Sequence, residues 1–546
     1  MPSLNWIGKK DIKNHHNHVE YRVIDCKESV GDTDNGNLIL QGDNLLALKA
    51  LLPYYAGRVK TIYIDPPYNT GNTKWIYNDA VDSPVIKKWL EKTVDKEDLS
   101  RTDKWLCMMY PRLKLLQQFL REDGVIFISI DDAELHNLKA ICHEIFGAKN
   151  WIETFIWNTD GNIDNQRKIK NNHEYILAYA KDINLFKSPK IIDPNIEEES
   201  KLFNEYIENT IVKNGTKNPA SDIVIPIGFP CDFEQGVISH DSKGFPNISN
   251  DIHVKNYRTI NEGILNSGWS SKNLFLQFIE NNYKPIIDTK GQETVFKLKQ
   301  SGAPYAFKKR LEDQSHVLSV LKNMGSTQQM NSFLEKLGLE FDYPKPLNLI
   351  KYLLSINDDP NGIFLDSFAG TGTTANAILE MNKDGGNRKF ILIEMLDYAK
   401  TITAERNKKI IEGYSYTDKK GKSFNVDGLG GGFQYCELSE PLLDEFGLLS
   451  DHVSFEILAK HIYFTEFGVA LPQEHLSEED HYAGKYKNKE LFVYLDQDFN
   501  LTELHKMTQK EADEYIAFVD TWSISEDLLR KYNITVKRLP IEIKGA

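Results

Sequence analysis

The chain has 546 residues, 41% of them hydrophobic, and a formal net charge of -14 at pH 7. This length predicts about two to four domains. No apolar run approaches the roughly 20 residues that span a bilayer, and the opening stretch MPSLNWIGKKDIKNHHNHVE lacks the apolar centre of a signal peptide. We therefore expect a cytoplasmic protein. The acidic balance argues against a simple nucleic-acid-binding protein, because attraction to phosphates usually requires a basic domain.

The five cysteines are Cys26, Cys107, Cys142, Cys231 and Cys436. They lie far apart, form no CxxC pair and are odd in number, which argues against a disulfide framework or a zinc site. We expect all five to be reduced, partly buried small residues.

The first third of the chain alternates strand and helix patterns. Short apolar runs predict strands, and leucines at helical spacing predict helices between them. In chain order we expect a strand at 38–41, a helix over 42–52, a strand at 61–64, a helix over 104–120 and strands at 125–130, 151–157 and 174–180. This alternation is typical of a parallel sheet covered by helices.

The pattern changes from about Phe186 to Met330. Acidic, Asn-rich and Gly/Pro-rich pieces separate short strand-like runs, and no sustained helical period appears before VLSVLKNMG (317–325). We expect an inserted domain here. Alternation then resumes with a helix over 346–354, a strand at 363–366, a helix over 373–382, a strand at 389–394 and a helix over 397–410. Strand candidates at 492–496, 515–520 and 534–543 predict a small α/β segment at the end.

A glycine-rich turn lies in FLDSFAGTGTTANAI, between the strand at 363–366 and the helix that begins near Thr373. Gly370 and Gly372 permit tight backbone geometry, and free N–H groups at the following helix start can face a polar ligand. The turn lacks the lysine of a nucleoside-triphosphate loop and the third glycine of a dinucleotide fingerprint. Glu394 ends the next strand, where an acidic side chain can accept hydrogen bonds from ribose hydroxyls. Together these features favour a nucleoside-containing cofactor over a mere compact connection.

A second turn, Asp65-Pro66-Pro67-Tyr68, ends the strand at 61–64. Pro-Pro is common in structural turns, but ligands of open α/β sheets bind at the carboxyl ends of the strands. A rigid turn there holds the Asp65 carboxylate, the Pro66 carbonyl and the Tyr68 ring in fixed relation. These groups suit a flat heterocycle that carries an amino group.

The motifs DPPY and FAGTGTT together resemble the catalytic and cofactor motifs of the S-adenosylmethionine-dependent DNA amino-methyltransferases, and their order resembles the permuted beta class. The stretches LILQGDNLLALKAL, IYIDPPYNTGN, NNHEYILAYAK and GGNRKFILIE resemble the modification (Mod) subunits of type III restriction-modification systems. The resemblance implies a Rossmann-like methyltransferase domain with circularly permuted motif order, formed by residues 1–189 and 331–436. It further implies an inserted target-recognition domain, 190–330. The small C-terminal α/β segment, 437–546, has no assignable motif, and dimer or partner contact is our hypothesis for it.

The resemblance also implies which residues hold the cofactor, S-adenosylmethionine. It assigns the loop role to Asp366, Phe368, Ala369, Gly370, Gly372 and Thr373, the ribose to Glu394, the adenine moiety to Asp43 and the methionine carboxylate to Lys345. Asp43 equally fits a helix N-cap before LLALKALL, and the two roles are compatible. The alternative for Lys345 is a surface lysine.

Asp65, Pro66, Pro67 and Tyr68 are the expected catalytic residues. Hydrogen bonds from an amino group to Asp65 and to the Pro66 carbonyl favour the more tetrahedral nitrogen of the transition state. Because that amino group lies inside the duplex, the base must flip out, and Tyr68 is expected to stack on it. No metal or covalent intermediate is required. His173 is expected to orient a loop, not to act as a base.

Asp at the first motif position favours adenine N6 as the target. The alternatives are cytosine N4, methylation of RNA, and a DNA-binding specificity subunit that positions a nuclease partner. Backbone contacts to double-stranded DNA are expected from Lys308, Lys309 and Arg310 in the inserted segment, and NQRKIKNN (165–172) is a second basic cluster. The resemblance implies a homodimer that can join a helicase-nuclease restriction (Res) subunit.

Overall fold

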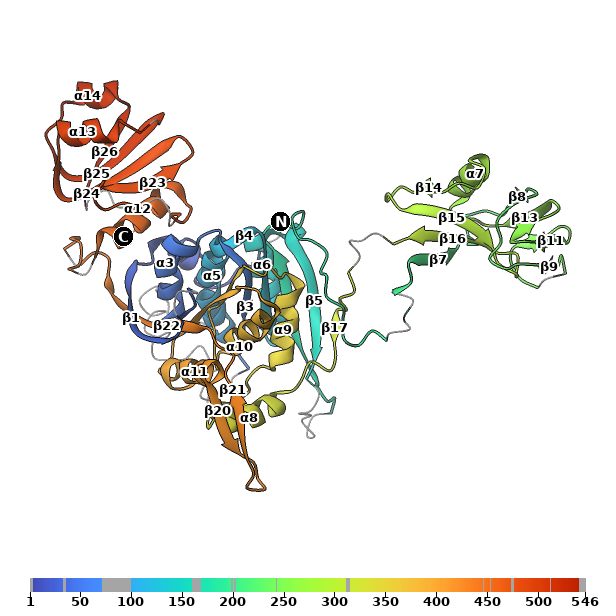
Figure 1. Ribbon diagram of the computed structural model, residues 1–546, viewed down its shortest axis with the longest axis horizontal. Helices are drawn as coiled ribbons and strands as arrows, with labels where there is room; N and C mark the ends of the chain where they lie inside the picture. Colours follow the sequence, from blue (N-terminus) through green and yellow to red (C-terminus); the bar gives the residue numbers. More distant parts are fainter. Residues whose placement is uncertain are drawn as a thin grey trace. The chain divides into compact units, whose positions relative to one another are not determined.

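The computed structural model divides the chain into two compact units, Met1–Lys187 with Leu318–Ala546, and Ser188–Val317. Figure 1 follows the chain through both. The residues that the structure describes are 3–32, 36–70, 100–159, 168–197, 200, 203–241, 243–310, 315–444, 446–451, 453–472, 476–510 and 512–539. Residues 165–167 of the basic cluster NQRKIKNN therefore lie outside the described residues.

A mixed sheet is the centre of the first unit. Within the described residues it has ten strands in the order β1, β22, β2, β19, β18, β3, β4, β6, β5, β17. The strands from β22 to β4 are parallel, and β6 runs antiparallel to β4 and β5. Their bounds are β1 Arg22–Gly31, β2 Leu38–Gln41, β3 Val59–Ile64, β4 Leu120–Ile130, β5 Trp151–Asn158, β6 His173–Ala180, β17 Val320–Leu321, β18 Ile363–Asp366, β19 Lys389–Glu394 and β22 Gly432–Pro441.

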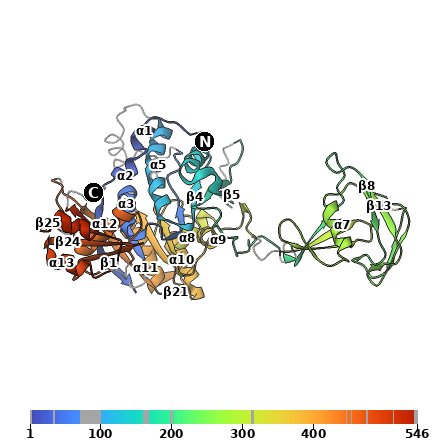
Figure 2. The same cartoon turned by 90° about the horizontal axis from the view of Figure 1, so that it is seen from above.

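Helices cover both faces of this sheet, as predicted for a Rossmann-like α/β fold. Figure 2 shows α3 and α5 on one side and α9, α10 and α11 on the other. No helix in the described part of the chain is long and apolar enough to cross a membrane. The bounds are α1 Lys9–Ile12, α2 His15–His18, α3 Asn44–Tyr55, α5 Arg101–Phe119, α6 Leu135–Cys142, α8 Thr327–Lys336, α9 Leu347–Ile356, α10 Thr373–Met381 and α11 Glu405–Glu412, the last continuing a π-helical turn, Ala399–Ala404.

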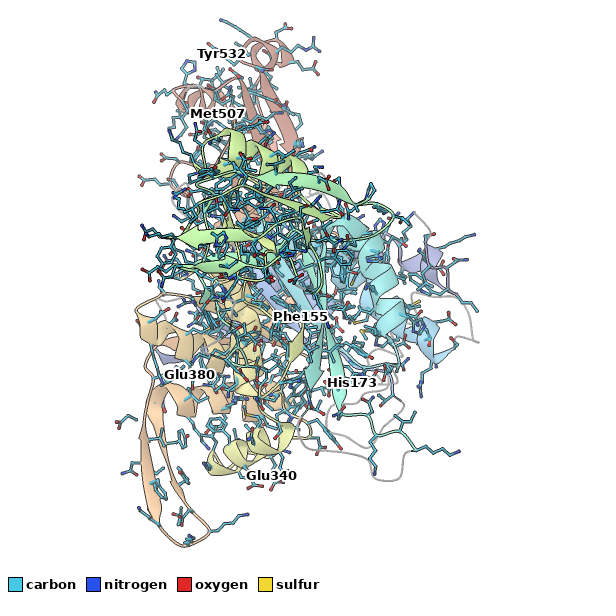
Figure 3. The ribbon with its side chains drawn as sticks, turned by 90° about the vertical axis from the view of Figure 1, so that its right-hand side faces the viewer. Phe155, His173, Glu340, Glu380, Met507 and Tyr532 are labelled. Carbon is cyan, nitrogen blue, oxygen red and sulfur yellow. A yellow bond between two sulfur atoms is a disulfide. The ribbon has the colours of Figure 1, made fainter. Side chains whose placement is uncertain are left out.

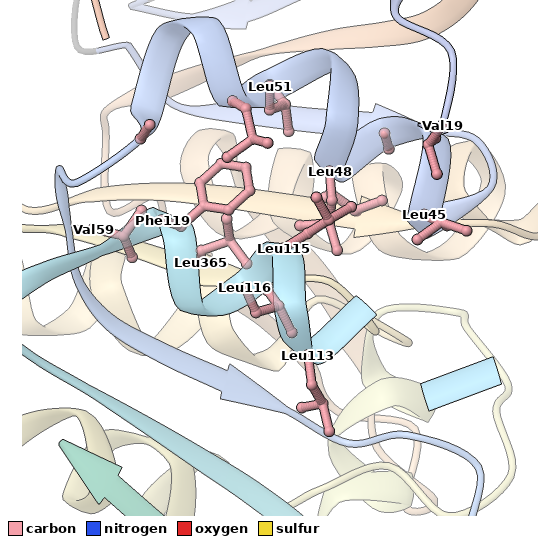
Figure 4. Close-up of a cluster of buried hydrophobic side chains, with 14 of the residues drawn as sticks. Val19, Leu45, Leu48, Leu51, Val59, Leu113, Leu115, Leu116, Phe119 and Leu365 are labelled. Carbon is pink, nitrogen blue, oxygen red and sulfur yellow. The ribbon is translucent and has the colours of Figure 1, made fainter. Parts of the chain in front are cut away.

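Leucines at helical spacing build the core between the sheet and the helices α3 and α5. The apolar faces of α3 and α5 pack against every second residue of the parallel strands. Ile62 and Ile64 of β3 therefore belong to the same cluster. Figure 4 shows part of it, with Leu45, Leu48 and Leu51 of α3, Leu113, Leu115, Leu116 and Phe119 of α5, and Val59 and Leu365 from the sheet. Both faces of the central strands are thereby withdrawn from water, which explains their continuous apolar sequences.

The strand pairing brings the two sequence motifs together. β18 lies directly beside β3 and parallel to it, with Leu365 opposite Ile62. Asp366 ends β18, and Asp65 follows β3. The two turns therefore leave neighbouring strands at the same edge of the sheet.

The second unit is a β-rich body with its own core. Its strands form sheets β10-β13-β8, β12-β11-β9 and β14-β15-β16-β7, and one helix, α7, packs on β15 through the ring contact of Phe275 with Phe296. The bounds are β7 Tyr206–Thr210, β8 Ser221–Ile225, β9 Gly236–Ile238, β10 Asn247–Ile248, β11 Ile252–Lys255, β12 Arg258–Thr259, β13 Gly263–Ser267, α7 Lys272–Glu280, β14 Ile286–Ile287, β15 Glu293–Leu298 and β16 Pro304–Lys309.

The C-terminal segment packs on the core of the first unit. Helix α12 contributes Leu458 and Ile462 to the main cluster, and the Arg58 guanidinium donates to the carbonyls of Ala470 and Leu471. A four-stranded sheet, β23-β24-β25-β26, follows. The bounds are α12 Phe455–Phe467, β23 Tyr482–Tyr486, β24 Lys489–Phe499, α13 Leu501–Met507, β25 Glu514–Trp522, α14 Glu526–Lys531 and β26 Ile534–Arg538. A separate hairpin, β20 Gly413–Thr417 and β21 Ser423–Asp427, precedes β22.

Two sequence predictions are wrong. Cys26 and Cys436 form a disulfide, because antiparallel pairing of β1 with β22 places them opposite each other across 410 residues of sequence. Cys107, Cys142 and Cys231 are free and buried, as expected. Helix α7 lies in a segment where we expected no helix. It is only nine residues long, so its apolar spacing is too short to show a sustained helical period. The segment 317–325, where a helical period was expected to resume, contains the short strand β17 instead.

Asn37 gives a direct test of the sheet. It is 4% exposed, and its amide donates to the Gly432 carbonyl and accepts from the Phe390 N–H, so it joins β2 to both neighbouring strands. Asn37→Leu removes both of these hydrogen bonds from the buried sheet, and we expect a loss of about 2–3 kcal/mol in the free energy of unfolding, measured by urea denaturation. The control Asn361→Leu, at an exposed turn, should change it by less than about 0.5 kcal/mol.

Candidate active site

A cavity of about 410 Å³ lies in the first unit at the carboxyl ends of β3 and β18. The DPPY turn contributes Asp65, Pro66 and Tyr68 to its wall. The glycine-rich turn contributes a longer list, Asp366, Phe368, Ala369, Gly370, Thr371, Thr373 and Thr374, and the segment 341–345 contributes Lys345. Most of the residues predicted for catalysis and for cofactor binding thus surround one space.

The DPPY turn is fixed from behind. The Trp105 indole donates to the Pro67 carbonyl at 2.6 Å, and Asn69, with a φ of 64°, donates to Glu134 at 2.6 Å. Pro67 does not line the cavity, and its carbonyl holds the turn in place by accepting this hydrogen bond. Among the described residues nothing donates to the Pro66 carbonyl, which belongs to the residue that does line the cavity.

A second carboxylate, Glu174, stands beside Asp65. The Tyr68 hydroxyl lies 2.9 Å from both Asp65 and Glu174, and the Lys345 ammonium lies 2.9 Å from Asp65 and 3.3 Å from Glu174. The ammonium is also 5.0 Å from the centre of the Tyr68 ring. Two acids, a phenol and an ammonium therefore form one closed network.

The network and its burial shift the pKa values of Lys345 and Tyr68. Burial alone would lower the pKa of Lys345, but Asp65 and Glu174 outweigh burial and raise it. Burial raises the pKa of Tyr68 well above its usual value, and the two carboxylates raise it further. Tyr68 is therefore a neutral hydrogen-bond donor and Lys345 a permanent cation at physiological pH.

The glycine-rich turn presents a buried acid to the cavity. Asp366 is 2% exposed and accepts from the Phe368 N–H at 3.1 Å and the Thr374 hydroxyl at 2.6 Å. No cation among the described residues pairs with it, and burial raises the pKa of Asp366 to about 7. Such an acid suits a ligand that brings hydrogen-bond donors or positive charge.

Glu394 supports this turn from the neighbouring strand β19. It accepts from the N–H groups of Gly370, Met395 and Leu396 at 2.9, 2.9 and 3.1 Å. Burial raises the pKa of Glu394 to about 7, against these hydrogen bonds. Glu394 lies beside the cavity and not in its described wall.

The two glycines of the turn differ in purpose. Gly370, with a φ of 51°, lines the cavity, whereas Gly372 lies off it with a φ of 76°. A Cβ on Gly372 would stand 2.4 Å from the Asn407 amide. Gly372 therefore allows close packing of the turn against the segment that ends in α11.

Arg406 is a buried cation behind the start of α10. It donates to the Thr371 and Thr373 hydroxyls at 2.7 and 2.8 Å and to Asn376 at 3.1 Å, all neutral acceptors. Burial lowers the pKa of Arg406 to about 9, still above physiological pH. Its charge adds to the helix N-terminus and favours an anionic group near the turn.

The remaining predicted residues lie elsewhere. Asp43 caps α3, accepting from Leu45 and Leu46, and pairs with Arg112 at 3.2 Å; it is absent from the described cavity wall. Its contact with a cofactor stays a prediction, while its N-cap role is confirmed.

Lys308, Lys309 and Arg310 belong to the second unit, on and just after β16. Lys308 is paired with the buried Asp288 at 2.5 Å, and Arg310 donates to the Asn204 carbonyl at 2.7 Å. Lys309 is exposed. The paired ammonium of Lys308 is therefore the least suited of the three to contact a phosphate.

Sequence reasoning missed Glu174, Trp105 and Arg406. Glu174 is the second residue of β6, directly after His173, and the sequence of this stretch predicts only a strand, with no role for Glu174. His173 also lines the cavity, and its ring lies 2.9 Å from the Tyr175 hydroxyl. Trp105 lies in a helical pattern typical of a core residue, and Arg406 in one typical of a surface residue. Only their contacts in the structure show that they support the site.

Comparison with known proteins identifies the family. Residues 59–405 match the family model described as DNA methylase. The chain is 31% identical to the EcoPI Mod subunit of a type III restriction-modification enzyme from Escherichia phage P1, over 72% of this chain and 63% of that protein. It is 30% identical to the EcoP15I Mod subunit from Escherichia coli, over 72% and 64%.

This chain thus spans less than two thirds of the length of these two relatives. A solved PvuII DNA methyltransferase, described as cytosine-N4-specific, matches 70% of this chain and 89% of its own at 11% identity, with a TM-score of 0.33. That likeness is too distant to bear on the substrate. The family model matches more than half of the residues, and the chain belongs to the DNA methylase family.

Proposed function

We propose that this protein transfers a methyl group from S-adenosylmethionine to the N6 amino group of adenine in double-stranded DNA. One observation carries the proposal: Asp65 and Asp366 lie in the wall of one cavity, at the ends of adjacent strands. Direct transfer needs the attacking nitrogen and the methyl carbon about 3 Å apart and in line. A cavity walled by both motifs can hold both partners.

The DPPY turn receives the base. Asp65 and the Pro66 carbonyl accept the two N–H groups of the adenine amino group, which favours the tetrahedral nitrogen of the transition state. The Pro66 carbonyl suits this role because it has no donor among the described residues. A base that stacks on Tyr68 uses the ring face opposite Lys345. Since the amino group of a paired adenine lies inside the duplex, the base must leave the duplex to enter the cavity.

The glycine-rich turn receives the cofactor, and its donor set fits that group. S-adenosylmethionine supplies a methyl group on a positively charged sulfur, which is an excellent leaving group. Asp366 offers an acid that has no partner cation among the described residues, and Phe368 offers an apolar wall. Glu394, Gly370 and Thr373 shape the turn, and the ribose hydroxyls are proposed to meet Glu394.

The methionine carboxylate needs a positive environment, and the structure offers two cations. Lys345 is held by Asp65 and Glu174, so it would have to exchange a carboxylate partner. Arg406 lies behind the start of α10 with neutral partners only. We propose that the methionine carboxylate lies at the start of α10, where the Arg406 charge adds to the helix N-terminus. Lys345 then neutralises Asp65 and Glu174 on the side of the cavity that receives the base.

The similarity to Mod subunits supports a role in a type III-like restriction-modification system. There the protein acts as the modification subunit, as a homodimer that can join a helicase-nuclease restriction subunit. The unit Ser188–Val317 is proposed to recognise the target sequence, with Lys309 as its best placed backbone contact of the three predicted. Such a protein works in the cytoplasm, where the DNA is.

Incubation with labelled S-adenosylmethionine and bacterial genomic DNA, followed by digestion to nucleosides, tests this function. We expect the label in N6-methyladenine, because Asp begins the DPPY motif. Label in N4-methylcytosine would replace the proposed target base. Label in RNA alone, or DNA binding without any transfer, would contradict the function itself.

Glu174→Gln tests the charge network. With one acid removed, Lys345 pairs more fully with Asp65 and weakens it as an acceptor of the amino group. We expect kcat for methyl transfer to fall about 10- to 100-fold, while the Kd for S-adenosylmethionine changes less than about threefold. Single-turnover rates and calorimetric titration measure the two quantities.

The matched control is Glu380→Gln, which removes an acid paired with Lys351 at the surface, at 3.1 Å. It should leave kcat and Kd unchanged. Equal loss of rate in both variants, or an unaltered rate in Glu174→Gln, would show that Glu174 has no part in the site.

A further inference from the structure

The hairpin β20–β21 stands out from the first unit. Figure 1 shows it projecting beyond α8 and α11, and Figure 3 shows it pointing to the lower end of the unit, where Glu340 is labelled. His173 lines the cavity, and Glu340 precedes Phe341, which also lines it. The hairpin therefore flanks the side of the unit on which the cavity lies.

The tip of the hairpin is basic and well formed. Asp418 accepts from the N–H groups of Lys420 and Lys422, and Gly421, with a φ of 79°, completes the turn. Lys419, Lys420 and Lys422 are all exposed, and no acidic side chain among the described residues pairs with them. The tip therefore carries three exposed ammonium groups, in contrast to the net charge of -14 of the whole chain.

Aromatic rings stiffen the stem. Tyr416 and Phe424 stack across the two strands with centres 5.1 Å apart, the Lys336 ammonium lies 5.1 Å from the Tyr416 ring, and the Lys422 ammonium lies 4.9 Å from the Phe424 ring. Cross-strand aromatic pairs stabilise an otherwise marginal two-stranded ribbon. The three lysines therefore lie at the tip of an ordered hairpin.

The base of the hairpin is packed on the wall of the cavity. Tyr414 contacts Phe333 of α8, and both join a small apolar cluster with Leu334, Leu337, Leu339 and Phe341. Phe341 lines the cavity, and so do Ser326, Thr327 and Gln328 at the start of α8. The base of the hairpin and this part of the cavity wall therefore share one apolar cluster.

We propose that this hairpin grips the DNA backbone beside the flipped base, with Lys419, Lys420 and Lys422 on phosphates. The inference rests on the proposed function, which makes duplex DNA the substrate. A two-stranded ribbon is narrow enough to lie along a groove, and its lysines match the phosphates in charge and add affinity without reading sequence. The catalytic unit thereby holds DNA itself, independently of the target-recognition unit.

The test compares DNA binding by the full chain and by Lys419→Ser/Lys420→Ser/Lys422→Ser, using fluorescence anisotropy with a short duplex at several salt concentrations. We expect the Kd at low salt to rise at least about tenfold and the slope of log Kd against log salt to fall by roughly 2 to 3, since each phosphate contact contributes about 0.9. Affinity for S-adenosylmethionine and discrimination between duplex sequences should not change.

The matched control replaces three exposed lysines elsewhere, Lys383, Lys506 and Lys531, by serine, which gives the same change in net charge. It should move the slope by less than 1. If the hairpin variant keeps the wild-type slope, or if the control loses as much, the inference is overturned. Wild-type methylation of DNA in the same preparation separates that result from a failure of the proposed function.

Discussion

The parallel pairing of β3 with β18 is the contact on which the site depends. It brings together two turns that lie about 300 residues apart in sequence, and it does so at the carboxyl edge of the sheet, where open α/β folds bind ligands. The buried, close-packed strands fix the register, with Leu365 opposite Ile62, so the spacing of Asp65 and Asp366 is set by the core. The insertion between the motifs forms its own compact unit and leaves this pairing undisturbed.

The two halves of the cavity differ in electrostatics. Around the DPPY turn, the Lys345 ammonium lies 2.9 Å from Asp65 and 3.3 Å from Glu174, so a positive charge offsets the two acids. Around the glycine-rich turn, Asp366 and Glu394 have no cation among the described residues, and burial raises the pKa of each to about 7. The first half suits a neutral base with N–H donors. The second suits a ligand that carries positive charge and hydroxyl groups.

The sequence predicts much of this arrangement, because the strongest signals are local. Strand-turn-helix patterns around Asp65 and Asp366 define the central strands, their order along the chain and most of the cavity wall. Glu174 and Arg406 escape notice because their partners come from other elements, and nothing in their own sequence context reports those contacts. The Cys26–Cys436 disulfide is hidden for the same reason: it depends on the pairing of β1 with β22 across 410 residues. Local sequence patterns do not reveal which strands far apart in the sequence pair, or in which register.

Calorimetric titration of S-adenosylmethionine into the variants Asp65→Asn and Asp366→Asn tests most directly whether the two motifs share one site and divide its duties. Asp65→Asn should bind the cofactor within about threefold of wild type, while methyl transfer falls at least about 100-fold. Asp366→Asn should weaken cofactor binding at least about tenfold. Normal cofactor affinity in Asp366→Asn, or full methyl transfer in Asp65→Asn, would contradict the account.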